Sequence, residues 1–274
     1  MEDFYSLINK YRQKNIGLVL ITVTNKEGMG PADVGKKMLV LENGESFGTV
    51  GGGAIEKYAQ NRAKDAIKNH SSFSEVYVLQ DKNVHVDNGE TQLLMACGGK
   101  ATLFYEYIGP KQYVYIFGGG HCGAALAKVL KPLEFYITVI DPRKDVLDAI
   151  DSSTVDEKVC SDFVEYVSNK NIKSDAYIVV CTPSHQFDYE VLDKLVETKL
   201  PMQYFGMLCS KKKKADYISR LLDKYGDIEL NNFYSPIGLD IGGTSPEEIA
   251  ISISSEILAV YYQKGQVIKH MKDR

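Results

Sequence analysis

Hydrophobic residues in the first part of the chain recur at the spacings of amphipathic helices and short strands. A period of about 3.6 residues predicts helices over residues 3–14 and 55–69. Runs rich in β-branched and aromatic residues predict strands at residues 17–24, 37–41, 74–80 and 101–108. Gly109 and Pro110 interrupt the pattern, and we place a domain boundary there. Residues 1–110 are therefore expected to form a smaller N-terminal α+β domain.

After this boundary the apolar residues come in short continuous runs, at residues 113–117, 136–140, 176–181 and 203–207. Helical patterns separate these runs, at residues 124–130, 189–198 and 212–225. Continuous apolar strands that alternate with helices are typical of a parallel sheet covered on both faces. The fold class expected is therefore α/β, with a Rossmann-like parallel-sheet domain over residues 111–274.

The last helix has an explicit start, because Ser245, Pro246 and Glu248 offer an N-cap, a proline at the first helical position and a capping-box glutamate. Four apolar residues then recur at helical spacing. They are Ile249, Ile253, Ile257 and Val260. We interpret this helix as a packing element rather than as a source of catalytic side chains.

Composition and charge narrow the class of protein. The 274 residues suffice for two ordinary domains, and the net charge of −4 argues against a broad nucleic-acid surface. The five cysteines form no CxxC pair, which fits a reducing compartment. The longest apolar run near the N-terminus, residues 16–23, is too short for a membrane helix. We expect a cytoplasmic protein with neither a nucleic acid nor a membrane as partner.

The strongest single motif is a glycine-rich turn between a predicted strand and a predicted helix. Gly118, Gly120 and Gly123 have the G-x-G-x-x-G spacing of a dinucleotide-binding turn. The first glycine permits the tight turn, the second lets a pyrophosphate approach the backbone, and the third allows close packing of helix on strand. A phosphate there would lie at the helix N-terminus, where free N–H groups favour anions.

The strand after this turn ends in Asp141, 18 residues beyond Gly123, near the position of a ribose-binding carboxylate. Arg143 is an alternative contact, because it could face a ribose 2′-phosphate. A purely structural interpretation is also open, in which the glycines only form the turn and Asp141 caps a helix or lies in solvent. NAD(P) is thus a candidate cofactor.

Further polar residues lie where the same predicted sheet has its carboxyl edge, which is where ligands of open α/β sheets bind. His121 lies in the glycine turn and His185 lies just beyond a predicted strand, so both are candidate acid–base residues. Ser210 and Lys211 follow another strand and are candidate phosphate contacts. We expect the three lysines that follow Lys211 to form a solvated surface.

Three segments of this domain resemble the XdhC/CoxI family of accessory proteins for molybdenum-cofactor enzymes. Residues 236–250 are similar to the family's C-terminal signature, and residues 204–211 to its strand–Ser–basic turn, with Cys209 where glycine is usual. Residues 181–188 resemble its Thr-His-x-His-x-x-Asp loop, with Pro183 in place of the first histidine. In the N-terminal part, residues 28–31, 48–53 and 97–99 also match, but Ala54 stands where the family commonly has a cysteine.

The resemblance implies a protein that binds newly made molybdenum cofactor, holds it during sulfuration and delivers it to a xanthine dehydrogenase-type hydroxylase. It implies the apo-hydroxylase and a cysteine desulfurase as partners, and a homodimer. On this hypothesis the chain is a maturation factor rather than an enzyme. Two alternatives stay open: an NAD(P)-dependent oxidoreductase, and a degenerate relative that keeps only the fold and an interaction surface.

A carrier of molybdopterin needs close approach of backbone, N–H donors and a soft ligand near the metal. Gly51, Gly52 and Gly53, just before a predicted helix, are candidates for the first two. Cys97, followed by Gly98, is the candidate cofactor and metal contact, because thiolates are soft ligands and sulfur carriers. The alternative for Cys97 is a small buried hydrophobic residue. For Glu56 we favour an ordinary surface position.

Overall fold

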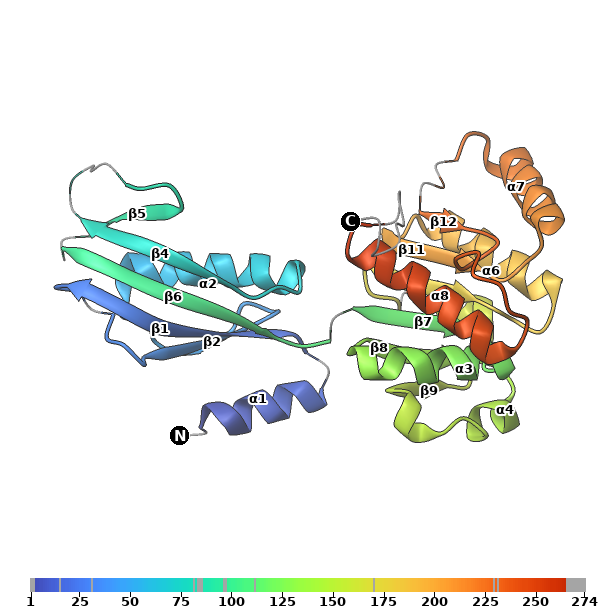
Figure 1. Ribbon diagram of the computed structural model, residues 1–274, viewed down its shortest axis with the longest axis horizontal. Coiled ribbons are helices and arrows are strands. Elements are labelled where there is room, and N and C mark those ends of the chain that lie inside the picture. Colours follow the sequence, from blue (N-terminus) through green and yellow to red (C-terminus); the bar gives the residue numbers. More distant parts are fainter. Residues whose placement is uncertain are drawn as a thin grey trace. The chain divides into compact units, whose positions relative to one another are not determined.

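The computed structural model describes residues 3–14, 16–30, 32–80, 82, 86–95, 98–110, 112–169, 171–228, 230 and 232–264. The chain divides into two compact units, Met1–Pro110 and Lys111–Arg274 (Figure 1). Each unit has its own sheet of six strands. Both sheets follow from the apolar patterns of the sequence.

The N-terminal unit is built on a mixed sheet with the strand order β3-β2-β1-β6-β4-β5. Neighbouring strands are antiparallel except for β4 and β5, which are parallel. The strands are β1 (Leu18–Gly28), β2 (Lys37–Leu41), β3 (Ser46–Gly48), β4 (Phe73–Gln80), β5 (Glu90–Leu94) and β6 (Gly99–Ile108). The four predicted strands are confirmed, whereas the sequence analysis missed β3 and β5.

Two helices cover opposite faces of this sheet, and β2 and the first half of β1 are accordingly apolar on both sides. The helix α2 (Gly53–Lys68) packs Ala59 and Ala63 against a core that includes Tyr77 and Tyr105. The helix α1 (Phe4–Gln13) contributes Leu7 to a separate cluster on the other face. Both predicted helices are confirmed.

The C-terminal unit contains a parallel sheet with the order β12-β11-β10-β7-β8-β9. The strands are β7 (Tyr113–Phe117), β8 (Tyr136–Ile140), β9 (Glu157–Val159), β10 (Ala176–Val180), β11 (Met202–Met207) and β12 (Phe233–Tyr234). Numbered from β7, this is the 3-2-1-4-5-6 order of the Rossmann fold. The predicted fold class is thus confirmed, although β9 and β12 are too short to have been recognised in the sequence.

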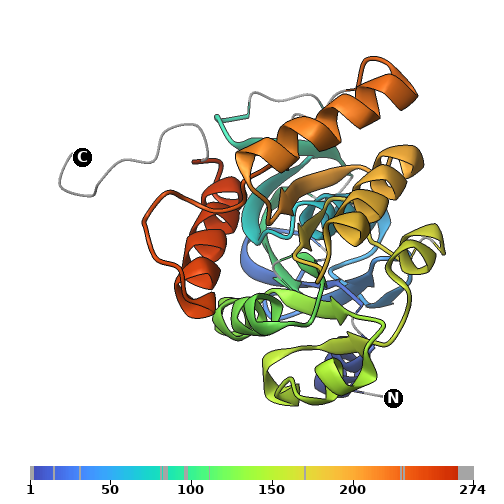
Figure 2. The same cartoon turned by 90° about the vertical axis from the view of Figure 1, so that its right-hand side faces the viewer.

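Helices cover both faces of the parallel sheet, as Figure 2 shows for α3 and α8 on one side and α5 and α6 on the other. The helices are α3 (His121–Leu130), α4 (Lys144–Asp148), α5 (Phe163–Ser168), α6 (His185–Thr198), α7 (Lys211–Tyr225) and α8 (Pro246–Tyr261). The prediction was wrong in leaving out α4 and α5, which have only five and six residues. Elements of about one turn carry too little periodicity to be recognised.

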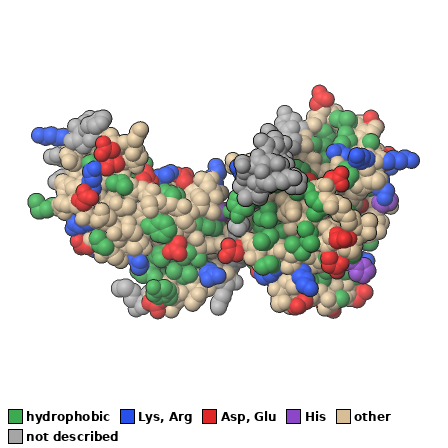
Figure 3. Space-filling model, viewed as in Figure 1, with side chains coloured by type: hydrophobic (Ala, Val, Ile, Leu, Met, Phe, Trp, Pro, Cys, Tyr) green, Lys and Arg blue, Asp and Glu red, His purple; other side chains and the backbone are tan. Residues whose placement is uncertain are grey.

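The final helix, α8, begins with the predicted capping box, since the Ser245 hydroxyl accepts the Glu248 N–H and the Glu248 carboxylate accepts the Ser245 N–H. Its buried face includes Ile253 and Ile257, as predicted. Ile251, on the outer face, is exposed, and Figure 3 shows hydrophobic side chains gathered at the surface over this helix.

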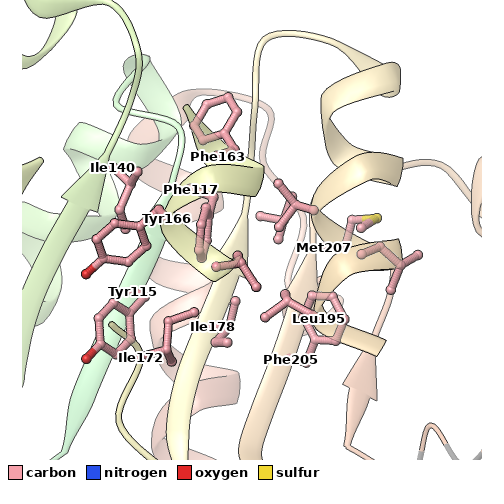
Figure 4. Packing of buried hydrophobic residues seen from close by; sticks show 14 of the residues in the cluster. Tyr115, Phe117, Ile140, Phe163, Tyr166, Ile172, Ile178, Leu195, Phe205 and Met207 are labelled. Carbon is pink, nitrogen blue, oxygen red and sulfur yellow. The ribbon is translucent and has the colours of Figure 1, made fainter. Parts of the chain in front are cut away.

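A separate hydrophobic core lies on each face of the parallel sheet. One includes Phe117, Phe163 and Leu195, and it joins the sheet to α5, α6 and α7 (Figure 4). The other joins the sheet to α3, α4 and α8 and includes Leu126 and Ile253. These two cores hold the strand ends in place, and the candidate site lies at those ends.

Among the residues that the structure describes, no helix is both long and apolar enough to cross a lipid bilayer.

Candidate functional site

The carboxyl edge of the parallel sheet has its topological switch point between β7 and β10. These strands pair in parallel, with Phe117 opposite Val180. From β7 the chain continues into α3, and from β10 into α6, on opposite faces of the sheet. A crevice forms where two such connections diverge, and it is the usual ligand site of an open α/β sheet.

Three glycines shape the turn from β7 into α3. Gly118 has φ +113°, and a Cβ there would clash with the carbonyl oxygen of Cys181 at the end of β10. A Cβ at Gly123 would clash with the carbonyl oxygen of Gly118. A Cβ at Gly120, by contrast, would meet nothing within 4 Å. Gly118 and Gly123 therefore make the turn possible, whereas Gly120 leaves the start of α3 open to a ligand.

Asp141 lies immediately after β8 and is completely buried. Its carboxylate accepts the N–H of Gly119 at 2.9 Å and two hydrogen bonds from the Arg143 guanidinium, at 2.9 and 2.8 Å. Burial raises the pKa of Asp141, but these hydrogen bonds outweigh burial, and the net pKa lies below its ordinary value. Asp141 and Arg143 thus form a charged pair that is fastened to the glycine turn.

Two thiols border the same turn. The Cys181 Sγ contacts the Gly118 carbonyl oxygen at 3.5 Å, and burial raises the pKa of this thiol. Burial also raises the pKa of Cys122, in the first turn of α3, and the charge of Glu247 acts in the same direction. A raised pKa keeps both groups as thiols at neutral pH, so neither has the electropositive setting of a reactive cysteine.

His185 begins α6 and lies among charged groups. Its side chain is 64% exposed, and its Nδ1 is 3.0 Å from the Lys213 Nζ and 4.0 Å from the Asp188 carboxylate. The Asp188 side chain is only 4% exposed and accepts hydrogen bonds from the Thr182 N–H and hydroxyl. Burial raises the pKa of Asp188 above its ordinary value. This arrangement of imidazole, ammonium and carboxylate can bind an anion or exchange a proton.

The sequence analysis missed Lys213, which was assigned to a solvated surface. The structure brings it to His185 because α6 and α7 start from the neighbouring strands β10 and β11. The sequence did hold a signal for this contact. Lys213 lies in the first turn of a helix capped by Ser210, and the starts of such helices lie at the carboxyl edge of the sheet.

The remaining predicted residues at this edge have local roles or lie in solvent. Ser210 caps α7, since its hydroxyl accepts the Lys213 N–H at 3.4 Å. Lys211 and His121 are exposed first residues of their helices. The structure therefore places both predicted histidines at one edge of the sheet, and it turns His185 toward α7.

The segment after β12 is fastened to α8 through Glu256. Its carboxylate accepts the Gly238 N–H at 3.0 Å and the Tyr204 hydroxyl at 2.6 Å. The Ser252 hydroxyl donates to the Leu239 carbonyl at 2.6 Å. These contacts fix the segment that leads to the capped start of α8.

In the N-terminal unit, Gly51, Gly52 and Gly53 all have positive φ values, of 135°, 76° and 64°. Two of their amide donors are used inside the turn. The Gly51 N–H donates to the Thr49 hydroxyl at 3.1 Å, and the Gly52 N–H donates to the Glu56 carboxylate at 3.1 Å. The Glu56 carboxylate therefore lies where a bound anion would otherwise accept the backbone N–H at the start of α2.

The sheet brings the other glycine segments to the same end of this unit. Gly28 pairs with Gly99 where β1 ends and β6 begins. A Cβ on Gly53 would lie 3.6 Å from the Met95 methyl group, whereas a Cβ on Gly52 or Gly98 would meet nothing within 4 Å. The start of α2 and Met95, which directly follows β5, are thus close neighbours, although more than forty residues separate Gly53 from Met95 in the sequence.

Cys97, the predicted cofactor and metal contact, lies outside the described residues. Within the described part of the chain, no three His, Cys, Asp or Glu side chains are grouped as a metal site would require.

Two hollows of about 390 and 250 Å³ lie elsewhere, at the amino ends of β10, β11 and β12. Asp175, Phe205 and Phe233 line the larger one. Both hollows lie at the opposite edge of the sheet from the glycine turn and form no part of the candidate site.

The strand order and the glycine turn define a two-unit protein with a Rossmann domain in its C-terminal part. A family model described as the XdhC Rossmann domain matches residues 114–257, and one described as the XdhC and CoxI family matches residues 12–77. The chain belongs to the XdhC and CoxI family.

Two curated relatives are similar to this chain. Over 253 residues it is 26% identical to a protein of Escherichia coli (strain K12) described as uncharacterized protein YqeB, covering 92% of this chain and 45% of the relative. Over 156 residues it is 30% identical to a protein of Bacillus subtilis (strain 168) described as a probable subunit of xanthine dehydrogenase, covering 57% of this chain and 45% of the relative. The chain spans about half the length of these relatives.

A solved structure described as a xanthine dehydrogenase from Bacillus halodurans is also similar, with a TM-score of 0.51 and 21% identity. The match covers 96% of this chain and 97% of that chain. At this identity the match establishes the fold.

Proposed function

We propose that the chain is an accessory protein that binds molybdenum cofactor and assists its sulfuration and insertion into a xanthine dehydrogenase-type hydroxylase. Membership of the XdhC and CoxI family is the observation that carries this proposal. The description of the Bacillus subtilis relative as a probable subunit of xanthine dehydrogenase is consistent with it.

The glycine segments of the N-terminal unit fit a flat, anionic pterin. Backbone is open at Gly52 and Gly98, where a Cβ would meet nothing within 4 Å, and the Met95 methyl group lies beside Gly53. A flat ring can approach such backbone closely because no side chain separates the two. When bound, the cofactor would supply a molybdenum centre with sulfur ligands, and Cys97 is the soft ligand that we propose for its metal end.

The polar groups around this turn suit transfer of the cofactor rather than permanent retention. The Glu56 carboxylate takes the Gly52 N–H at 3.1 Å and the Thr49 hydroxyl at 2.5 Å. An anionic ligand at the start of α2 must compete with this carboxylate. We therefore propose a maturation factor that releases its ligand to a partner, and not a catalyst.

The partners that we propose are the apo-hydroxylase, a cysteine desulfurase and a second copy of the chain. The desulfurase would supply the terminal sulfur, and the apo-hydroxylase would receive the cofactor. The NAD(P)-dependent oxidoreductase alternative is less well supported, since its only candidate acid–base residues are His121 and His185, and both are exposed.

The test is anaerobic incubation of the full chain with molybdenum cofactor, followed by gel filtration and measurement of pterin fluorescence in the protein peak after oxidation. The variant Cys97→Ala is run beside the wild type. Cys160→Ala is the matched control, because Cys160 is an exposed cysteine of the other unit. We expect pterin to elute with the wild type and with the control.

Loss of pterin in Cys97→Ala alone would place Cys97 at the cofactor. Retention in all three proteins would support the carrier role but remove the role of Cys97. A wild-type peak without pterin would refute the proposal.

A further inference from the structure

The charged pair of Asp141 and Arg143 bears on which nucleotide the Rossmann domain can bind. The pair belongs to the C-terminal unit, so this question is independent of cofactor binding in the N-terminal unit. In a dinucleotide-binding Rossmann domain, the acid at the end of the second strand accepts hydrogen bonds from the ribose hydroxyls. Asp141 is that acid, because it follows β8, the strand beside β7. Its surroundings therefore decide how a ribose would be recognised.

The acceptor capacity of Asp141 is already used. Its two oxygens receive the N–H of Gly119 at 2.9 Å, the N–H of Arg143 at 3.0 Å, and the Arg143 Nε and Nη2 at 2.9 and 2.8 Å. An ionised carboxylate offers about four lone-pair positions. The side chain is also completely buried, so a ribose diol would find neither a free lone pair nor an exposed oxygen.

Arg143 is the group that this pair presents outward. Its side chain is 41% exposed, and Asp141 engages only one edge of its guanidinium. The bond to Asp141 and the charge of Asp145 both raise the pKa of Arg143, so it stays charged. A guanidinium has five N–H donors, and those not directed at Asp141 suit a phosphate, which binds arginine in a bidentate manner.

The pair is also held next to the glycine turn. The hydrogen bond from Gly119 to Asp141 ties the end of β8 to the loop between β7 and α3. The strands β7 and β8 are neighbours in the sheet (Figure 1). A nucleotide whose pyrophosphate lies at Gly120 would bring its ribose toward the end of β8. It would therefore meet a fixed guanidinium.

We propose that the Rossmann domain binds, at the carboxyl edge of its sheet, a nucleotide whose adenosine ribose carries a phosphate, and that Arg143 is the specificity-determining residue. NADP(H) has this chemistry at the ribose 2′ position, and an adenosine 3′-phosphate has it at the 3′ position. An unmodified ribose diol binds more weakly, because Asp141 is unavailable to it.

Titration calorimetry of the full chain with NADP⁺ and NAD⁺ tests this inference. We expect NADP⁺ to bind at least about tenfold more tightly, as an added charge-assisted contact would give. In Arg143→Ala the preference should disappear, because NADP⁺ loses its guanidinium contact and the two Asp141 acceptor positions that the guanidinium filled become available to the ribose of NAD⁺. Arg143→Lys should keep part of the preference, since a lysine retains the charge but not the bidentate geometry. Arg220→Ala is the matched control, because Arg220 is a half-exposed arginine paired with Asp216 on α7.

The fragments 2′-AMP, 3′-AMP and 5′-AMP then identify the phosphate position that Arg143 recognises. Equal affinity for NADP⁺ and NAD⁺, a preference that survives in Arg143→Ala, or no binding of either nucleotide would overturn the proposal. If Arg143→Ala fails to fold, the NADP⁺ and NAD⁺ affinities of the wild type and of Arg143→Lys still test the proposal. Pterin retention by Arg143→Ala is measured in parallel, so that failure of this inference is distinguished from failure of the carrier proposal.

Discussion

The hydroxyl of Tyr204 donates a hydrogen bond of 2.6 Å to the carboxylate of Glu256, which joins the centre of β11 to α8. Tyr204 is fully buried, and burial raises its pKa well above the ordinary value, so the phenol keeps its proton. The same carboxylate accepts the Gly238 N–H. One half-buried glutamate thus connects a strand, a helix and the segment between them.

Glu256→Ala should lower the free energy of unfolding by about 2–3 kcal/mol, because it leaves the buried Tyr204 hydroxyl and the half-buried Gly238 N–H without a partner. Urea unfolding of the full chain measures this change. Asp148→Ala is the control, since Asp148 belongs to an exposed ion pair with Lys144 that contributes about 0.5 kcal/mol or less. Equal losses of unfolding free energy in the two variants would mean that the Glu256 contacts stabilise the fold no more than an exposed ion pair does.

Alanine substitutions at Gly118 and Gly120 should have different effects. Gly118→Ala forces a Cβ against the Cys181 carbonyl at φ +113°, and it should destabilise the C-terminal unit by about 2 kcal/mol or more. Gly120→Ala fits the fold, because its Cβ meets nothing within 4 Å, but it should weaken nucleotide binding. Thermal melting and calorimetry of both variants check this. An unstable Gly120→Ala would show that the open space at Gly120 is absent.

The pair of Asp141 and Arg143 should make stability depend on pH. The folded-state pKa of Asp141 lies below its ordinary value of 3.8, so the carboxylate stabilises the fold above about pH 4. This contribution is lost as pH falls through the folded-state pKa. Asp141→Asn should therefore be less stable than the wild type by about 2–4 kcal/mol at pH 7, with the difference shrinking below pH 4. Urea unfolding of both proteins between pH 3 and pH 7 measures it; a difference independent of pH would contradict the assignment.

Glu56→Gln should strengthen binding of the anionic cofactor to the N-terminal unit. The substitution removes a negative charge from the start of α2, which is worth about 0.3–1 kcal/mol, or about a two- to fivefold gain in affinity. Anaerobic titration with molybdenum cofactor measures this, and Glu42→Gln, an exposed glutamate of the same unit, serves as control. Weaker binding in Glu56→Gln would instead mean that Glu56 contacts the ligand directly.

Local pattern was sufficient for strands that consist of a mostly apolar run and for a helix start that is marked by its capping residues. The strands β2, β7 and β8 have the predicted bounds, and Ser245 and Glu248 form the predicted capping box. Both signals lie within a few consecutive residues. The elements that the sequence analysis missed, such as α4 and β12, are five and two residues long.

The sequence by itself determined the class of fold, the glycine turn and the residues that follow each strand, since all of these depend on local spacing. Tertiary structure alone decided which of those residues meet. It filled the acceptor positions of Asp141 with Arg143 and Gly119, and it set Lys213 against His185. Such contacts depend on strand order and on where buried charges find partners. Gly119 and Lys213 are distant in the sequence from Asp141 and His185, and Arg143, although only two residues from Asp141, turns toward it because that carboxylate is buried, so no local pattern records these contacts.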